Sequence, residues 1–196
     1  MGKYHVDEIP SWMVETPVEE YDEDFVKIID FFQFHAPVPG QSARCKTLQE
    51  YGWDSPWKKP YWLNKQLKRA ASNHDLLFTA ESQGRMDVNL EKANLSESFP
   101  SDMLRERICV ANNKKNQFMS VFYHIRDSFA HGRFFITEVE KQKIIVMEDV
   151  APRGRPLIVT GRMIIKKQTL LKWIEIINGG EKEYSNCYCS LPSQIK

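Results

Sequence analysis

The spacing of apolar residues along the chain changes from a helical to a strand-like period near residue 133. Before that point apolar residues recur every three or four positions, as they do on one face of a helix. The helical spacing returns near residue 167 and ends at Gly179-Gly180, a pair that stops helices. We therefore predict helices over about 19–35, 61–80, 101–131 (with a bend or break at Asn112-Asn113) and 167–178.

Between the last two predicted helices the period becomes two, which is typical of strands. Residues 134–139 and 143–148 flank a short polar turn and predict a hairpin over 134–148. Residues 157–165 supply a third strand after a segment rich in proline and glycine. We expect 82–100 to be a polar, turn-rich connection. The chain then divides into three parts: an irregular acidic arm (1–18), a single domain (19–180) and a tail (181–196).

Length and composition limit the class of protein. The chain has 196 residues, of which 42 % are hydrophobic, enough for one domain with its own core. It contains no apolar run of 18 residues and no signal-peptide pattern, so we expect no membrane segment. Its four cysteines show neither disulfide nor zinc-finger spacing, which favours a reduced, cytoplasmic protein.

The net charge of +1 conceals an uneven distribution. Residues 1–26 hold eight acids and one base, a charge of −7, so the remaining residues carry +8. A basic body attracts nucleic acid by releasing counterions, and an acidic arm could shield it. The alternative is that these charged side chains are simply solvated on the surface and bind no nucleic acid.

One segment, residues 118–133, combines residue types that suit chemistry on phosphates. An apolar helix runs into Arg126-Asp127, reaches His131 and stops at Gly132. Arginine binds phosphate with a fork of donors, and histidine transfers protons near neutral pH. The spacing alone is weak, because Arg69 and His74 repeat it. In the simplest alternative, His131 complements the helix dipole and Arg126 pairs with a surface acid.

The same segment resembles the HEPN family, whose signature is an arginine, usually a polar residue next, and a histidine four to six residues later at a helix end. The matching residues are Arg126, Asp127 and His131, flanked by Ile125, Ala130 and Gly132. The resemblance implies a mainly α fold, a HEPN-like helical bundle, to which the strands add a small antiparallel sheet as an insertion or extension. It also implies a metal-independent endoribonuclease that acts as a homodimer.

The biological setting implied by the resemblance is toxin-antitoxin or antiviral defence in a prokaryotic cytoplasm, with an antitoxin or another regulatory partner. The alternatives are a non-catalytic HEPN-like module that dimerises or binds nucleic acid, and a helical RNA-binding accessory protein.

A helical wheel defines the geometry expected of one copy. The apolar residues that cluster on one side, and so form the predicted core face, are Phe118, Val121, Phe122, Ile125 and Phe129. His131 lies roughly 140° from Arg126 on a regular helix. One copy therefore does not aim both side chains at one point, whereas two copies around a two-fold axis would pool them. Asp127 precedes His131 by one turn and is placed to orient the imidazole.

The expected chemistry needs no metal or cofactor. Arg126 would stabilise the scissile phosphate, while His131 would move the proton of the ribose 2′-hydroxyl or of the leaving oxygen. We expect His124, Arg133, Lys114 and Lys115 to contact RNA; the alternative for His124 is a plain surface residue, and for the lysines solubility. His124, Asp127 and His131 share a stripe that suggests a metal, but histidines seven apart are about 10 Å apart along the helix, too far to chelate.

Overall fold

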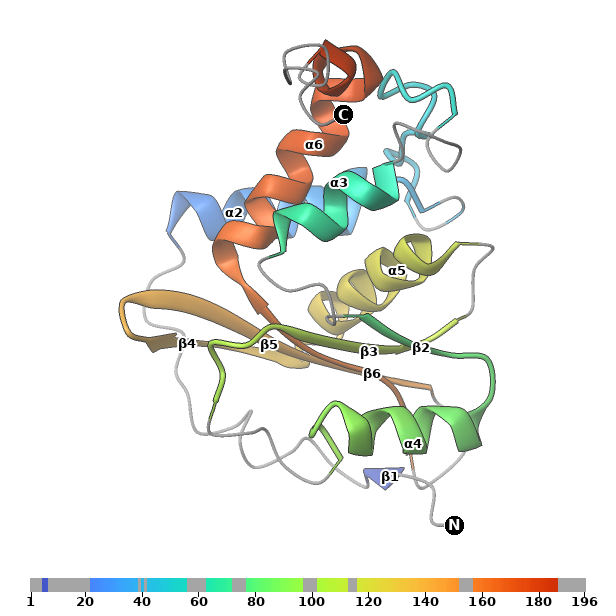
Figure 1. Ribbon diagram of the computed structural model, residues 1–196, viewed down its shortest axis with the longest axis vertical. Helices are drawn as coiled ribbons and strands as arrows, with labels where there is room; N and C mark the ends of the chain where they lie inside the picture. The colour runs from blue at the N-terminus through green and yellow to red at the C-terminus, as the bar shows by residue number, and fades with distance from the viewer. Residues whose placement is uncertain are drawn as a thin grey trace, which may run out of the picture.

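A mixed β-sheet separates two hydrophobic cores of unequal size (Figure 1). The computed structural model describes residues 5–6, 22–38, 40, 42–55, 63–71, 77–96, 102–112, 116–151 and 157–186. In this part of the chain, no helix has the length and apolar character needed to cross a bilayer.

The strands lie in the order β2-β3-β6-β5-β4, and β1 pairs with β6. Their bounds are β1 His5–Val6, β2 Leu77–Ala80, β3 Arg107–Ala111, β4 Phe134–Val139, β5 Gln142–Ala151 and β6 Leu157–Lys166. Among the described strands only β2 and β3 run parallel, and α4 (Gln83–Lys92) lies in the crossover between them, which parallel neighbours require. The last three strands form an antiparallel meander.

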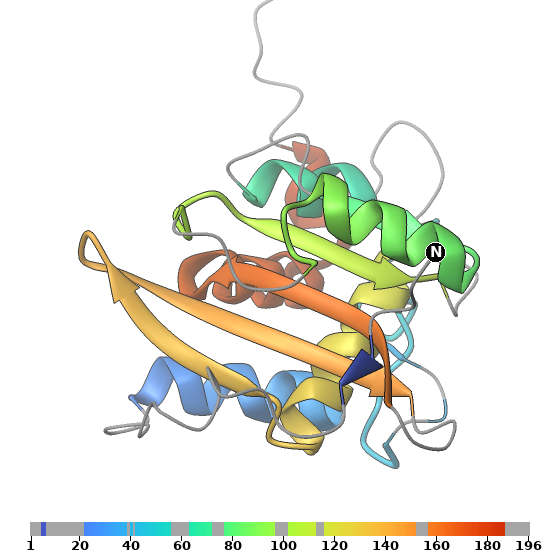
Figure 2. The ribbon, with the colours of Figure 1, turned by 90° about the horizontal axis from the view of Figure 1, so that it is seen from below.

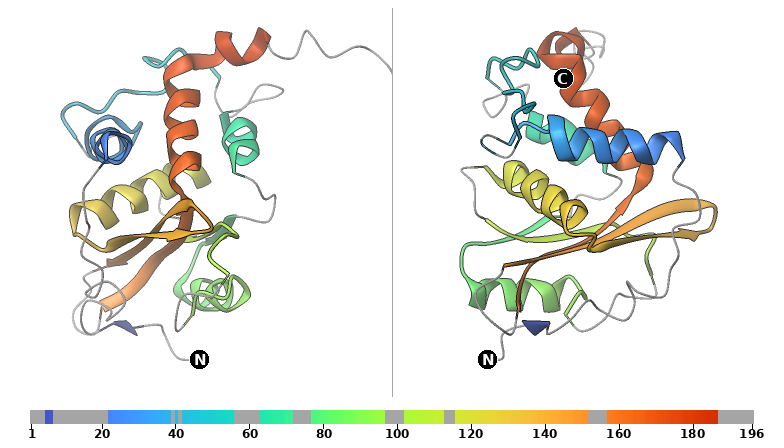
Figure 3. Two further views of the ribbon diagram at one scale, coloured as in Figure 1. Left: turned by 90° about the vertical axis from the view of Figure 1, so that its left-hand side faces the viewer. Right: turned by 180° about the vertical axis from the view of Figure 1, so that it is seen from behind.

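Most helices cover one face of this sheet (Figure 3). They are α2 (Glu23–Asp30) with its π-helical continuation η1 (Phe31–His35), α3 (Leu63–Ala70), α5 (Gln117–Ala130) and α6 (Lys167–Asn186). Trp173 of α6 lies at the centre, with its ring edge-on to those of Phe118 and Phe122 at centroid distances of 5.6 and 6.0 Å. These fully buried rings fix α5 against α6 and the sheet.

The opposite face carries the smaller core and is packed by α4 (Figure 2). Met86 and Leu90, one turn apart on α4, are fully buried against this face. The strands meet both cores because side chains alternate across a sheet: Ile145 and Met147 face the larger core, Ile144 and Val146 the smaller one.

Helix α5 has distinct signals at both ends. The side chain of Asn116 caps its start by accepting the N–H of Phe118 at 2.9 Å. At its end Gly132 adopts a φ of 63°, and the N–H groups of Gly132 and Arg133 donate to the carbonyls of Phe129 and Ser128. This is a Schellman motif, which explains why the helix stops where glycine follows His131. The predicted core face of the helix is confirmed, since all five of its residues are buried.

The expected mainly α fold, a HEPN-like bundle with a sheet insertion, is wrong. The sheet is the centre of an α+β fold, and β2 and β3 occupy parts of the expected helices 61–80 and 101–131. Both strands are short apolar runs, which periodicity alone does not separate from buried helix. In contrast, α4 forms within 82–100, where we expected turns. The sequence did not predict this helix because only Met86 and Leu90 mark its apolar face.

Candidate functional site

Arg126 and Asp127 form an ion pair near the end of α5. Nη1 of Arg126 lies 2.7 Å from Oδ1 of Asp127, and the two side chains are 23 % and 15 % exposed. The carbonyl of Arg126 accepts a hydrogen bond from Nε2 of Gln33 at 2.9 Å, which ties this turn to η1. Nε of Arg126 is buried and has no hydrogen-bond partner among the described residues. The guanidinium is thus held on one side and retains donor capacity.

Tyr123 extends this pair into a chain of three groups. Its hydroxyl donates a hydrogen bond to Asp127, one helical turn further on. Burial, followed by this bond to a carboxylate, raises the pKa of Tyr123 to about 12. The signal for this contact in the sequence is the spacing of four residues between Tyr123 and Asp127, which places both on one face of the helix.

His131 lies beyond the ion pair, at the cap of α5. Its backbone N–H donates to the carbonyl of Asp127 at 3.0 Å, and its side chain is exposed. No hydrogen bond or ion pair joins its imidazole to the Asp127 carboxylate in the described part of the chain. The carboxylate therefore holds Arg126 in this structure, and the pooling of two copies stays a prediction.

The structure places His124 in the interior, with only 1 % of its surface exposed. Its Nδ1 lies 2.6 Å from Oδ2 of Asp149 and its Nε2 lies 2.8 Å from the carbonyl oxygen of Ala111. Thr160 donates a further hydrogen bond to the same carboxylate oxygen at 2.9 Å. His124 is thus engaged with the sheet and is not presented to a ligand.

Arg133 is also buried, within a cluster of charges on the sheet. Its Nη2 donates to one oxygen of Glu148, and Nε of Arg162 donates to the other at 2.8 Å. Nη1 of Arg162 reaches the Leu95 carbonyl beyond α4 at 2.8 Å. Arg133 therefore links the end of α5 to β5. The remaining expected contacts, Lys114 and Lys115, lie outside the described residues.

Two pockets lie elsewhere in the fold. One, of about 310 Å³, opens where β2 and β3 end and α4 begins, beside Glu81, Asn112 and Thr160. The other, of about 250 Å³, lies at the opposite end of α4 and is lined by basic residues. Among the described residues, no three histidines, cysteines or acids are grouped so as to hold a metal ion.

A comparison with models of protein families, with curated proteins and with solved structures found no match. The resemblance of residues 118–133 to the HEPN family stays a prediction.

Proposed function

We propose that this protein is a metal-independent endoribonuclease whose site is built on the end of α5. The observation that supports it most directly is the arrangement of Arg126, Asp127 and His131. A partly exposed guanidinium, held by a carboxylate, precedes an exposed imidazole by five residues, or about 7.5 Å of helix axis. The Schellman motif after His131 fixes the backbone from which the imidazole projects.

The reaction follows from the chemistry of these groups. The 2′-oxygen of the ribose attacks the adjacent phosphorus as its proton leaves, and the bond from phosphorus to the 5′-oxygen breaks as that oxygen gains a proton. His131 carries out one of these two proton transfers. Arg126 stabilises the charge that develops on the phosphoryl oxygens. The products are a 2′,3′-cyclic phosphate and a 5′-hydroxyl, and no metal takes part.

Asp127 has a positioning role in this proposal. Its carboxylate bonds to Arg126 and to the hydroxyl of Tyr123, so it fixes the guanidinium and not the imidazole. The charge-assisted bond limits the rotamers of Arg126 and reduces the entropy lost when a phosphate binds.

The site is completed by a second copy of the chain. On a regular helix Arg126 and His131 point in different directions, so a homodimer would supply the arginine of one subunit and the histidine of the other to each cleft. RNA is the substrate, drawn by the basic body of the chain. An acting toxin or defence effector in a prokaryotic cytoplasm needs an antitoxin or a similar regulator, as the HEPN resemblance implies.

An RNA cleavage assay in EDTA tests the proposal. The wild type should cut mixed RNA and leave 2′,3′-cyclic phosphates, while a 2′-deoxy substrate stays intact. His131→Ala and Arg126→Ala should each reduce the rate by about a hundredfold or more. His74→Ala is the matched control, because Arg69 and His74 repeat the spacing. Equal loss in this control, or full cutting by both variants, would contradict the proposal. Binding without cutting would favour the non-catalytic module.

A complementation experiment tests the shared site separately. The two inactive variants, Arg126→Ala and His131→Ala, are co-expressed so that mixed dimers form. If each cleft takes its arginine and histidine from different subunits, a mixed dimer keeps one intact cleft of two. Random mixing then restores about a quarter of the wild-type rate. No recovery, despite mixed dimers isolated by two affinity tags, would rule out a shared cleft.

A further inference from the structure

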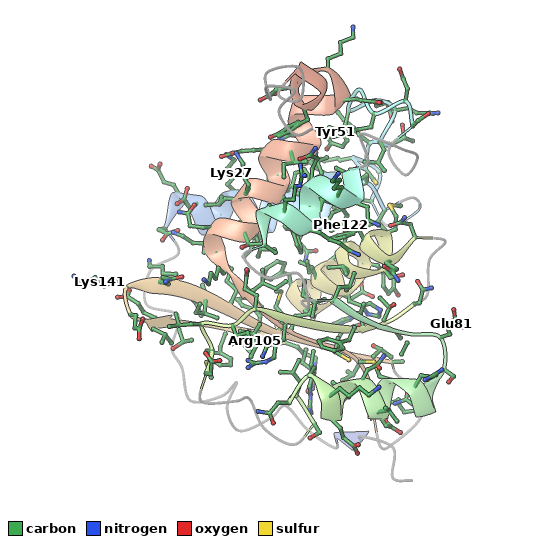
Figure 4. The ribbon with its side chains drawn as sticks, in the orientation of Figure 1. Lys27, Tyr51, Glu81, Arg105, Phe122 and Lys141 are labelled. Atoms are coloured by element: carbon green, nitrogen blue, oxygen red, sulfur yellow. The ribbon has the colours of Figure 1, made fainter. Side chains whose placement is uncertain are left out.

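A small basic pocket lies on the side of the sheet opposite α5, at the end of α4. Its volume is about 250 Å³, and it is lined by Phe78, Lys92, Ala93, Asn94, Arg105 and Arg107. Figure 4 shows Arg105 beneath the sheet, with Glu81 at the far end of the α4 layer. Cations thus come from two parts of the chain: the last residue of α4 and the segment that enters β3.

Arg107 forms the inner wall of this pocket. Its side chain is buried, and Nη1 donates to the carbonyls of Asp102 and Arg105 at 2.7 and 3.2 Å. Oδ2 of Asp102 lies 3.5 Å from Nη2. Burial lowers the pKa of Arg107, and the charge of Arg105 adds to this effect, while Asp102 opposes it. The guanidinium is therefore fixed in place and crowded by a second cation.

Lys92 and Arg105 are exposed at the rim of the pocket. Neither side chain is required to cap the C-terminal end of α4. The N–H groups of Leu95 and Asn94 donate to the carbonyls of Leu90 and Glu91 at 2.8 and 3.0 Å, with Asn94 at a φ of 55°. This Schellman motif satisfies carbonyls that cations might otherwise cap. Within the described part of the chain, neither Lys92 nor Arg105 forms an ion pair with a carboxylate. Two exposed positive charges therefore line the pocket opening.

We propose that this pocket binds the phosphate group of a small phosphorylated ligand or of an RNA backbone. A phosphate supplies a negative charge to the two exposed cations, Lys92 and Arg105, and arginine donors match its oxygens. Phe78 offers an apolar wall, and Asn94 an amide, to whatever the phosphate carries. The volume falls just below the range of about 300–1,000 Å³ typical of drug-sized ligands, which suits a single nucleotide or sugar phosphate. The inference is independent of the proposed ribonuclease, because none of its residues belongs to α5.

Calorimetric titration of the full chain tests this inference, with inorganic phosphate, ribose 5-phosphate and a short RNA as ligands. The variants are Lys92→Gln, Arg105→Gln and the double substitution, which alter exposed side chains and should leave the fold intact. Arg85→Gln is the matched control, since it removes the same charge from an exposed position of the same helix. We expect each single variant to bind roughly tenfold more weakly, and the control to change by less than about twofold.

The ligand series separates the two sources of phosphate. If the variants bind inorganic phosphate and ribose 5-phosphate more weakly than the wild type does, the ligand is a free small molecule. An effect confined to RNA, with a shallower dependence on salt, identifies a backbone contact. The inference is overturned if the wild type binds none of the three, or if the double variant binds them as tightly as the wild type. His131→Ala should leave phosphate binding unchanged, so loss of cleavage alone does not affect this result.

Discussion

The imidazole of His124 lies between the carboxylate of Asp149 and the carbonyl of Ala111, buried where α5 packs against the sheet. Both ring nitrogens of His124 lie within hydrogen-bonding distance of an oxygen atom. Gly161 leaves room for it: a Cβ there would stand 3.3 Å from the Cβ of His124. The register of β5 and β6 also shifts between Asp149 and Val150. The sheet is locally shaped around this pair.

Breaking this pair should destabilise the fold strongly. We expect Asp149→Ala to lower the free energy of unfolding by about 1–3 kcal/mol, because it leaves a buried ring nitrogen of His124 without its hydrogen-bond partner. Urea denaturation followed by circular dichroism measures this. Glu138→Ala, at an exposed position of β4, should change stability by less than about 0.5 kcal/mol. A loss below about 1 kcal/mol for Asp149→Ala would show that the pair contributes little.

Gly161 and His124 should be coupled. Gly161→Ala places a methyl group in tight contact with the histidine, and we expect a loss of about 1–3 kcal/mol from overpacking. In a His124→Ala background the same substitution should cost less, because the Cγ contact at 3.4 Å is gone and the remaining Cβ can shift into the space that the ring vacates. A double-mutant cycle from urea denaturation gives the coupling energy, and strictly additive losses would contradict the contact.

Asp22 joins three segments that are far apart in sequence. It caps α2 by accepting the N–H of Phe25, and its Oδ2 lies 2.8 Å from Lys143 and 2.9 Å from Lys167. These bonds, that of Lys143 first, hold the pKa of Asp22 well below its usual range. We expect Asp22→Ala to cost about 1 kcal/mol near neutral pH, mainly from the lost cap.

The pH dependence of this cost has a definite sign. A lowered carboxylate pKa stabilises the fold above the unfolded-state value of 3.8, and this contribution is lost as the pH falls further. The stability difference between wild type and Asp22→Ala should therefore narrow below about pH 4. Asp22→Asn keeps an oxygen for the cap and should show an intermediate loss. A difference that stays constant from pH 7 to pH 2 would exclude the ionic contribution.

Tyr123 should make the fold sensitive to alkali. Its pKa is raised from 10.0 to about 12, so the unfolded chain releases this proton before the folded chain does. Stability should fall as the pH rises from 10 towards 12, and Tyr123→Phe should lessen the fall. Urea denaturation at pH 9, 10 and 11 measures this. Tyr51, whose pKa is also raised to about 12, provides a comparison variant, Tyr51→Phe. An unchanged pH profile in Tyr123→Phe would contradict the cause assigned here.

The elements that the sequence predicted are those in which apolar residues lie on one face and polar residues on the other. Strands β4 to β6 coincide closely with the expected ranges, and α5 fills the part of 101–131 that follows the expected break, because their apolar residues repeat with a clear period. Strand β3 (Arg107–Ala111) has no such contrast, since its residues are buried on both faces. Helix α4 was missed for the opposite reason, as Gly84 and the polar residues between Met86 and Leu90 resemble a turn region.

The candidate site at the end of α5 was chosen from the sequence and stays a prediction, and the sequence did not give the partners of all its residues. Arg126 and Asp127 are neighbours in the chain, so their pairing was within reach of local reasoning. The partner of His124 is Asp149 on β5, 25 residues away, and that contact exists only once the sheet is assembled. Predicting that His124 is buried therefore required the tertiary structure, because its side-chain partner is far away along the chain.

The central strand of the sheet, β6, is also the last of the described strands along the chain. Strand β6 pairs with β1, β3 and β5, so none of these has its full set of neighbours until residues 157–166 have left the ribosome. Until β6 is synthesised, β3 and β5 each have an unpaired edge, and such edges can pair with other chains. We therefore expect folding to be completed only after β6 is synthesised and to depend on contacts between residues far apart in the chain.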